Sequence, residues 1–284
     1  MIIFVLWSIK VIRKYEAGPC LKRYRKKNTP VLWYKRFNPT AFAETGEKNV
    51  MQRSAPTILE NFYRHDIVTL LNGNSNIGVE LGVAEGIFSE RMVNSGMFAT
   101  FIGIDMYADA HDTAQYKRAL KRVGIYSNYK ILRMRFDQAL ELFDDESLDF
   151  IYIDGYAHGG EEGGQTIFDW YKKVKVGGVI AGDDYHPDWP LVREAVNEFA
   201  SQLGEELFIT GKTETGIEYC YYPTWAVRKS RHVDLNLPIE LVKKGLRVSW
   251  FARGGIKGII RRLLPASVIT LLRPIYRKFY FLQR

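Results

Sequence analysis

The sequence predicts an α/β protein with a doubly wound, mostly parallel seven-stranded sheet, an antiparallel terminal strand, and basic extensions at both ends. Between residues 77 and 203, short apolar runs alternate with amphipathic stretches, and two further strand-like runs follow. Strict alternation favours a parallel sheet, because parallel strands must be joined by crossovers that helices usually supply. The chain of 284 residues is 46% hydrophobic, which is enough to bury a substantial core.

The elements are predicted in the following order. Apolar residues at near-helical spacing predict a first helix over residues 56–71, ended by Asn72-Gly73. Five strands are predicted at residues 77–81, 101–105, 129–134, 148–154 and 178–183. Helices are predicted at residues 88–94, 113–123, 138–143, 164–174 and 190–203. Two strand-like runs, residues 207–210 and 219–227, predict a terminal hairpin-like pair.

Charge is distributed very unevenly along the chain. The total is +8, but residues 1–37 carry +9 and residues 228–284 carry +12, so the middle of the chain carries −13. We therefore expect three parts: a basic aromatic arm (1–55), an acidic folded domain (56–230) and a basic amphipathic extension (231–284). Nucleic acid is an unlikely partner, because the acidic domain would repel a phosphate backbone.

The cysteines and the apolar runs indicate the cellular compartment in which the protein is expected. Cys20 and Cys220 have no zinc-type neighbours, which favours a reducing compartment over a disulfide scaffold. The apolar start has its charges after it and no cleavage site, and no run reaches the ~20 apolar residues needed to span a bilayer. We expect a cytoplasmic protein, with peripheral attachment to the inner face of the membrane left open.

A glycine-containing turn follows the first strand of the alternating region. Glu80, Gly82 and Gly86 are spaced Glu-x-Gly-x-x-x-Gly, which differs from the Gly-x-Gly-x-x-Gly of dinucleotide sites. Asp105 ends the next strand, where a carboxylate can accept hydrogen bonds from both hydroxyls of a ribose. These features predict an adenosine-containing ligand without a diphosphate; a tight turn without a ligand is the alternative.

Three carboxylates are predicted at neighbouring strand ends. Asp154 ends the fourth of these strands, and Asp183 and Asp184 end the fifth. Strand ends of an open parallel sheet share one crevice, and carboxylates that close together destabilise the fold unless a positive charge lies between them. A divalent cation would supply that charge, and oxygen ligands favour Mg²⁺, Ca²⁺ or Mn²⁺. Alternatively, one aspartate binds a ligand while the others cap helices or meet solvent.

Four segments together resemble the class I S-adenosylmethionine-dependent methyltransferases: residues 77–90 (IGVELGVAEGIFSE), 101–107 (FIGIDMY), 147–158 (SLDFIYIDGYAH) and 176–186 (VGGVIAGDDYH). The resemblance covers about residues 56–228 and implies a Rossmann-like fold with S-adenosylmethionine as cofactor. It assigns cofactor contacts by position to Glu80, Gly82, Gly86, Ser89, Asp105, Met106, Phe136, Asp137 and Asp154.

The aspartates are similar to those of metal-dependent O-methyltransferases of the catechol type, and closer to those of macrocin-type enzymes that methylate sugar hydroxyls. This resemblance implies a divalent cation, Mg²⁺ or another hard ion, held by Asp154, Asp183 and Asp184. Those relatives place a His or a Lys three residues after the first Asp, where this chain has Ala157. His158 is therefore the predicted general base and His186 the reserve candidate.

We expect an O-methyltransferase acting on a hydroxyl of a sugar, glycan or related small metabolite. A non-catalytic protein of this fold, acting as a membrane-associated adapter or binding module, is the alternative, and an NAD-dependent oxidoreductase is disfavoured by the glycine spacing. Residues 257–284 mix apolar and basic residues in the manner of interfacial helices on anionic membranes. Packing of this segment on the domain, or on a second copy in a homo-oligomer, remains open.

Overall fold

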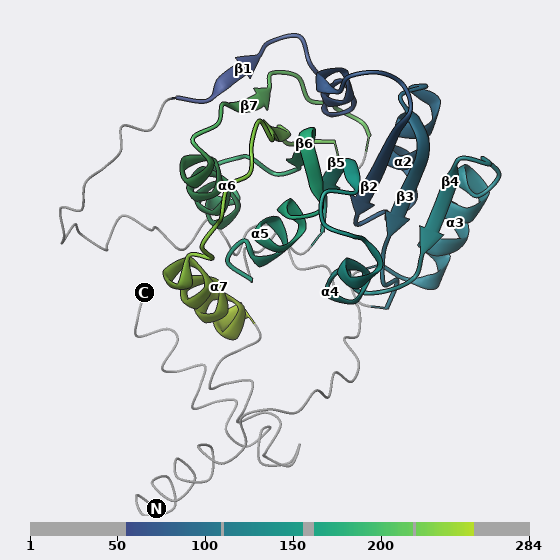
Figure 1. Ribbon diagram of the computed structural model, residues 1–284. Coiled ribbons are helices and arrows are strands. Elements are labelled where there is room, and N and C mark those ends of the chain that lie inside the picture. Colours follow the sequence, from purple (N-terminus) through teal and green to yellow (C-terminus); the bar gives the residue numbers. More distant parts are fainter. Residues whose placement is uncertain (1–54, 109–110, 156–161, 218–219, 253–284) are drawn as a thin grey trace, which may run out of the picture. The chain divides into compact units, whose positions relative to one another are not determined.

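The computed structural model describes residues 55–108, 111–155, 162–217 and 220–252. Its centre is an eight-stranded sheet in the order β1-β7-β8-β6-β5-β2-β3-β4 (Figure 1). The strands are β1 (Thr57–Leu59), β2 (Asn76–Leu81), β3 (Phe98–Ile104), β4 (Tyr129–Leu132), β5 (Leu148–Ile153), β6 (Val174–Gly182), β7 (Leu207–Thr210) and β8 (Trp225–Arg228). The α-helices are α2 (Ile87–Asn94), α3 (Thr113–Val123), α4 (Phe136–Ala139), α5 (Gln165–Tyr171), α6 (Pro190–Leu203) and α7 (Ile239–Ala252), and the 3-10 helices are η3 (Arg64–Leu70) and η4 (Leu140–Leu142).

The sheet confirms the predicted fold class. Strands β4, β3, β2, β5 and β6 are parallel neighbours, and β8 lies antiparallel between β6 and β7. The strand order reverses direction of growth between β2 and β5, the position at which open α/β sheets form their ligand crevice. The fold is therefore Rossmann-like, as expected.

Helices cover both faces of the sheet because side chains alternate along each strand. Val79 and Ile151 are fully buried in a cluster that includes side chains of α5 and α6. Phe150 and Tyr152, one residue out of phase, belong to a second cluster with Phe88 of α2. Both faces are thus closed by apolar packing, which explains why the central strands are continuous apolar runs.

The predicted first helix over residues 56–71 is wrong in its first half. Residues 57–59 form β1, which pairs in parallel with β7 at the edge of the sheet and adds an eighth strand (Figure 1). A separate helix, η3, follows β1, and at its N-terminus the Tyr63 amide donates to the Asp66 carboxylate at 2.8 Å. The apolar spacing combined residues of two different elements. Ile67 and Val68 belong to η3 and are buried in the core, whereas Ile58 belongs to the edge strand and is 48% exposed.

The other elements follow the predictions with shifted ends. The helices at residues 113–123 and 190–203 have the predicted bounds, while the helix predicted at 138–143 begins at Phe136 and changes to a 3-10 turn. The strand predicted at 219–227 is limited to β8, and the strand predicted at 178–183 begins earlier, at Val174. None of these shifts changes the topology.

The C-terminal extension folds onto the domain as far as Ala252. Lys244 of α7 forms an ion pair with Glu194 of α6 at 2.6 Å, and the Gln202 side chain donates to the Asn236 carbonyl at 2.9 Å. Residues 231–252 therefore pack on the domain. Residues 257–284, for which packing or membrane contact is open, lie outside the described residues, as does nearly all of the N-terminal arm. Within the described ranges, no helix has the length and apolarity to cross a membrane.

Candidate functional site

The carboxyl ends of four parallel strands lie in one row. The last paired residue of β2, Leu81, stands opposite both Ile104 of β3 and Ile153 of β5, and Ile153 stands opposite Gly182 of β6. The residue that follows each of these four strands is a predicted site residue: Gly82, Asp105, Asp154 and Asp183. The register thus brings together positions that the sequence separates by up to about a hundred residues.

Gly82 allows the turn after β2 to touch the end of β5. It has φ +99°, and a Cβ at this position would lie 1.8 Å from the carbonyl oxygen of Asp154. The Asp154 amide donates to the Leu81 carbonyl at 2.8 Å, and the Gly82 amide donates to the Ile104 carbonyl at 2.9 Å. The close approach explains why glycine is needed here, independently of any ligand.

Asp105 holds the glycine turn by collecting backbone amides. Its carboxylate accepts hydrogen bonds from the amides of Val83 at 3.0 Å, Ala84 at 3.1 Å and Tyr107 at 2.9 Å, and lies 2.6 Å from Nδ1 of His111. Burial would raise the pKa of Asp105, but the hydrogen bond and charge of His111 and the backbone amides outweigh it, so the pKa is lowered. This carboxylate therefore holds the glycine turn in place. It also lies at the strand end where a ribose contact was predicted.

Glu80 forms a buried polar network beneath the turn. Its carboxylate accepts a hydrogen bond from the Ser89 hydroxyl, which also lies 3.0 Å from the Tyr129 hydroxyl. Ser89 is fully buried, so its contact with any ligand would pass through Glu80. Burial raises the pKa of Glu80 well above its ordinary value, and the Ser89 hydrogen bond only partly opposes that effect.

The positive charge between the aspartates comes from Arg64 of η3. Its Nη2 lies 2.6 Å from Oδ2 of Asp154, and its Nη1 lies 3.3 Å from Oδ2 of Asp183. The guanidinium carbon lies 4.9 Å from the Phe88 ring centre and 5.1 Å from that of Tyr152. Burial alone would lower the pKa of Arg64, but the two carboxylates and Tyr152 keep it well above its ordinary value.

This arrangement does not fit the predicted divalent cation. A guanidinium lies between Asp154 and Asp183, and the part of the chain that the structure describes contains no group of three or more His, Cys, Asp or Glu able to hold a metal ion. The third predicted ligand, Asp184, is buried with φ +63°, and its carbonyl oxygen accepts a hydrogen bond from the His186 amide at 2.7 Å. The need for a positive charge was predicted correctly, but its source is an arginine.

The remaining predicted cofactor residues differ in solvent exposure. Phe136 lies against Gly155, where a Cβ would be 2.5 Å from the ring, so this aromatic side chain borders the end of β5. The Asp137 side chain is 62% exposed and pairs with Arg135. Met106 is half-buried, and its carbonyl accepts a hydrogen bond from the Arg133 side chain.

Of the two candidate general bases, only His186 lies among the described residues. His158 lies outside the described residues. His186 packs against Tyr222, with ring centres 4.8 Å apart, and its Nδ1 accepts from the Asp188 amide at 3.2 Å. The choice between them stays a prediction.

Arg64, His111 and Tyr129 were not singled out from the sequence. Arg64 is the only Lys or Arg between Ser54 and Glu90, which is the one signal that could have drawn attention to it. Its partners lie 90 and 119 residues further along the chain. Long-range ion pairs of this kind have no sequence motif.

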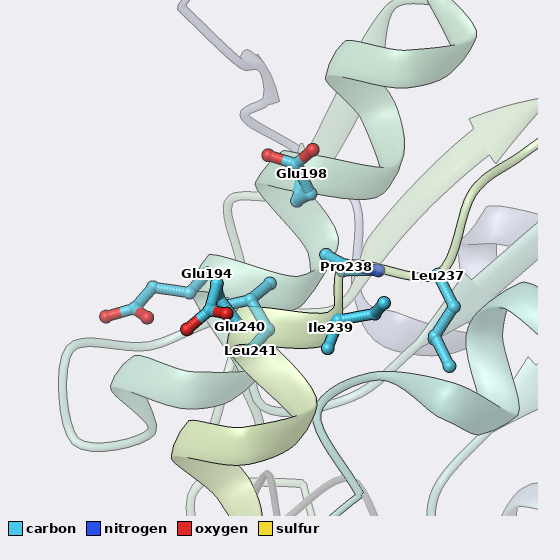
Figure 2. A pocket seen from close by; sticks show the side chains of 7 residues that line it. All are labelled: Glu194, Glu198, Leu237, Pro238, Ile239, Glu240 and Leu241. Atoms are coloured by element: carbon cyan, nitrogen blue, oxygen red, sulfur yellow. The ribbon is translucent and has the colours of Figure 1, made fainter. Parts of the chain in front are cut away.

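An open groove of about 620 Å³ lies elsewhere, between α6 and the start of α7. Figure 2 shows the residues that line it: Glu194, Glu198, Leu237, Pro238, Ile239, Glu240 and Leu241. None of the predicted site residues is among them, and Glu194 is paired with Lys244. The groove is a feature of helix packing and is distinct from the strand-end site.

Comparison with known proteins identifies one domain in the middle of the chain. Residues 77–185 match a protein family described as a methyltransferase domain, and this stretch contains the glycine turn, Asp105, Asp154, Asp183 and Asp184. No curated protein matches the chain. The match places a methyltransferase domain at the centre of the chain and supports a methyltransferase enzyme.

Solved structures also match this chain, at low sequence identity and with TM-scores below 0.5. A protein from Corynebacterium glutamicum is 15% identical, with 60% of this chain and 82% of that chain aligned and a TM-score of 0.44. An O-methyltransferase from Bacillus cereus, solved with S-adenosylhomocysteine (SAH), is 16% identical over 57% of this chain and 77% of its own, with a TM-score of 0.42. The N-methyltransferase NodS from Bradyrhizobium japonicum is 19% identical over 59% and 95%, with a TM-score of 0.44.

The close approach at Gly82 predicts a stability difference between two glycines. Gly82 and Gly73 both have positive φ, so alanine at either costs about 1–2 kcal/mol of backbone strain. Only Gly82→Ala also meets backbone atoms, which adds about 1–3 kcal/mol. Urea unfolding should therefore show a clearly larger loss for Gly82→Ala than for Gly73→Ala, whose position has open space around it. Equal losses would contradict the close backbone contact.

The buried Glu80 predicts a pH-dependent gain in stability on neutralisation. Because its folded-state pKa is raised, the folded protein retains a proton that the unfolded chain loses above about pH 4.3, so this group lowers stability as pH rises. Glu80→Gln should therefore stabilise the protein more at about pH 8 than at about pH 5, measured by urea unfolding. Glu60→Gln, at an exposed position, is the control. A gain that does not change with pH would rule out the buried-carboxyl explanation.

Proposed function

We propose that this methyltransferase transfers a methyl group from S-adenosylmethionine to a hydroxyl oxygen of a sugar, glycan or related small metabolite. The observation that carries the proposal is the row of strand ends, where a glycine turn, the Asp105 carboxylate and the Asp154 carboxylate are neighbours at one edge of the sheet. Open α/β sheets bind their ligands at this edge.

We assign different parts of the donor to the glycine turn and to Asp105. Gly82 and the turn after it leave backbone close to the crevice without a side chain, and Asp105 offers an ionised carboxylate at the end of β3. A carboxylate is an acceptor for hydroxyl donors, which suits the two hydroxyls of a ribose. S-adenosylmethionine supplies an electrophilic methyl group, and the chain's task is to orient the two reactants.

Asp154 is the residue best placed to orient the acceptor. It follows β5 directly, its backbone carbonyl touches the glycine turn, and its side chain is 15% exposed, whereas that of Asp183 is 6% exposed. A carboxylate at this position can accept a hydrogen bond from an acceptor hydroxyl and point its oxygen toward the donor. Proton removal is assigned to His158, with His186 as the reserve.

The charge of the central domain supports a neutral acceptor. The net −13 of residues 38–227 disfavours phosphate-rich substrates, whereas hydroxyl groups of sugars carry no charge to repel. Asp154, the most exposed of the aspartates that follow the strands, offers a hydrogen-bond acceptor, which suits the hydroxyl donors of a sugar.

The alternative is a binding module that retains the fold without catalysis. The aligned glycine turn and carboxylates favour catalysis, because a module that binds through its outer surface has no physical need for several buried acidic groups at the strand ends, each with a desolvation cost. Calorimetry and a methyl-transfer assay separate the two possibilities.

Calorimetric titration tests the donor first. S-adenosylmethionine and S-adenosylhomocysteine should bind, and NAD should not. Asp105→Asn should weaken binding about tenfold or more, because charge-assisted hydrogen bonds are lost. Asp145→Asn, whose side chain is 66% exposed and far along the chain from the turn, should leave binding unchanged.

Transfer of a labelled methyl group into fractionated cell extract tests catalysis. Label should enter a small-molecule or glycan fraction, and Asp154→Ala should abolish this while largely sparing donor binding. Donor binding without any transfer would favour the binding module, and binding of NAD alone would overturn the proposal.

We also propose that the basic termini hold the enzyme at an anionic membrane surface. Residues 253–284 contain eight Lys or Arg and no acidic residue, interspersed with apolar residues. Basic residues near anionic lipid contribute about 1 kcal/mol each. This would bring the site to a lipid-linked or surface glycan.

Vesicle co-sedimentation tests the membrane proposal. The full chain should sediment with anionic vesicles and not with neutral ones. A full-length variant with the eight basic residues after Ala252 changed to Gln should lose most of this binding. Equal recovery of both proteins with anionic vesicles would remove these residues as the anchor.

A further inference from the structure

We propose that the Arg64 guanidinium is the fixed positive charge of the methyl-transfer site, and that methyl transfer here needs no divalent metal. The inference rests on the proposed function and deepens it. Arg64 is then a positioning residue, which acts through Asp154 rather than by touching the reactants.

The geometry is that of a bridge between two strands. Two different nitrogens of one guanidinium reach Asp154 after β5 at 2.6 Å and Asp183 after β6 at 3.3 Å. The planar fork of arginine suits this task, because it can donate to two carboxylates at once in a fixed orientation. A single guanidinium thereby supplies the counter-charge that the sequence assigned to a cation.

The surroundings of Arg64 fix the guanidinium in place. Its side chain is 4% exposed and lies against the stacked pair of rings of Phe88 and Tyr152, and its Nη1 donates to Sγ of Cys220 at 3.8 Å. Contact with aromatic faces stabilises a desolvated cation. A group so enclosed cannot reach an acceptor directly, but it determines where Asp154 points.

Removing this charge would take a bridging positive charge away from two carboxylates in a low-dielectric setting. Removing one partner of a buried ion pair is strongly destabilising, because the remaining charge is buried without an opposite charge nearby. The Asp154 side chain, the more exposed of the two, would also lose the contact that orients it. Both stability and turnover should therefore depend on Arg64.

The first experiment uses the wild-type enzyme. Methyl transfer should be unchanged by EDTA and by added Mg²⁺ or Mn²⁺, and calorimetric titration with Mn²⁺ alone should show no binding. A loss of turnover in EDTA that Mg²⁺ restores, or stoichiometric Mn²⁺ binding that Asp154→Asn abolishes, would overturn the inference. The Mn²⁺ titration remains decisive even if no methyl acceptor is found, so it separates this inference from the proposed function.

The second experiment removes the guanidinium and returns it. Arg64→Ala should lower kcat about 100-fold, as expected when a catalytic carboxylate is misplaced, with little change in donor affinity. Added guanidinium ion at low, non-denaturing concentration should restore part of the activity. Urea has the same shape without the charge and should restore none. Arg122→Ala, which removes an ion-paired arginine from α3, should respond to neither. Equal effects of guanidinium and urea would contradict an electrostatic role.

Two further variants cover the case in which Arg64→Ala does not fold. Arg64→Lys keeps the charge but cannot donate to both carboxylates with one planar group, so kcat should fall with donor affinity retained. Asp183→Asn in the Arg64→Lys background should partly recover the melting temperature, because one demand for counter-charge is gone. Independent effects of the two substitutions on melting temperature would show that Arg64 and Asp183 are not coupled.

Discussion

Two carboxylates at neighbouring strand ends, enclosed by protein, require a positive charge between them, and the site is organised around this requirement. Arg64 meets it from η3, and η3 is held in place because Ile67 and Val68 are buried in the core. The position of the guanidinium is therefore set by apolar packing rather than by a flexible side chain on the surface. A segment that precedes the matched methyltransferase domain is, for this reason, part of its site.

The other side of the site is fixed by backbone contacts. Gly82 lets the turn after β2 touch the Asp154 carbonyl, and the Asp105 carboxylate collects amides from the same turn. The turn is thus tied to β5 on one side and to the end of β3 on the other. A change in either contact would move the turn relative to both carboxylates, so the ends of β2, β3 and β5 are coupled through the backbone.

The sequence predicted what depends on local pattern and missed what depends on distance. Alternating apolar runs place strands and helices, and the ends of parallel strands then place Gly82, Asp105 and Asp154 in one crevice. The edge strand β1 was read as helix because its pairing partner, β7, lies about 150 residues away. The same separation hid Arg64: charge balance showed that a cation was needed, but no local pattern could tell a metal ion from a distant arginine.

Segments on both sides of the matched domain pack against it. At Gly163 a Cβ would lie 2.4 Å from the Cα of Val242, so α7 lies directly against the residues that precede α5. Gly164 is similarly close to Ala195 of α6. Gly163 and Gly164 therefore allow α6 and α7 to pack closely against the start of α5. Segments that precede and follow the matched domain thus both pack against it, because η3 supplies the guanidinium at Asp154 and α7 contacts the residues that lead into α5. Under the proposed function, we expect differences in acceptor preference to come from these added segments rather than from the glycine turn.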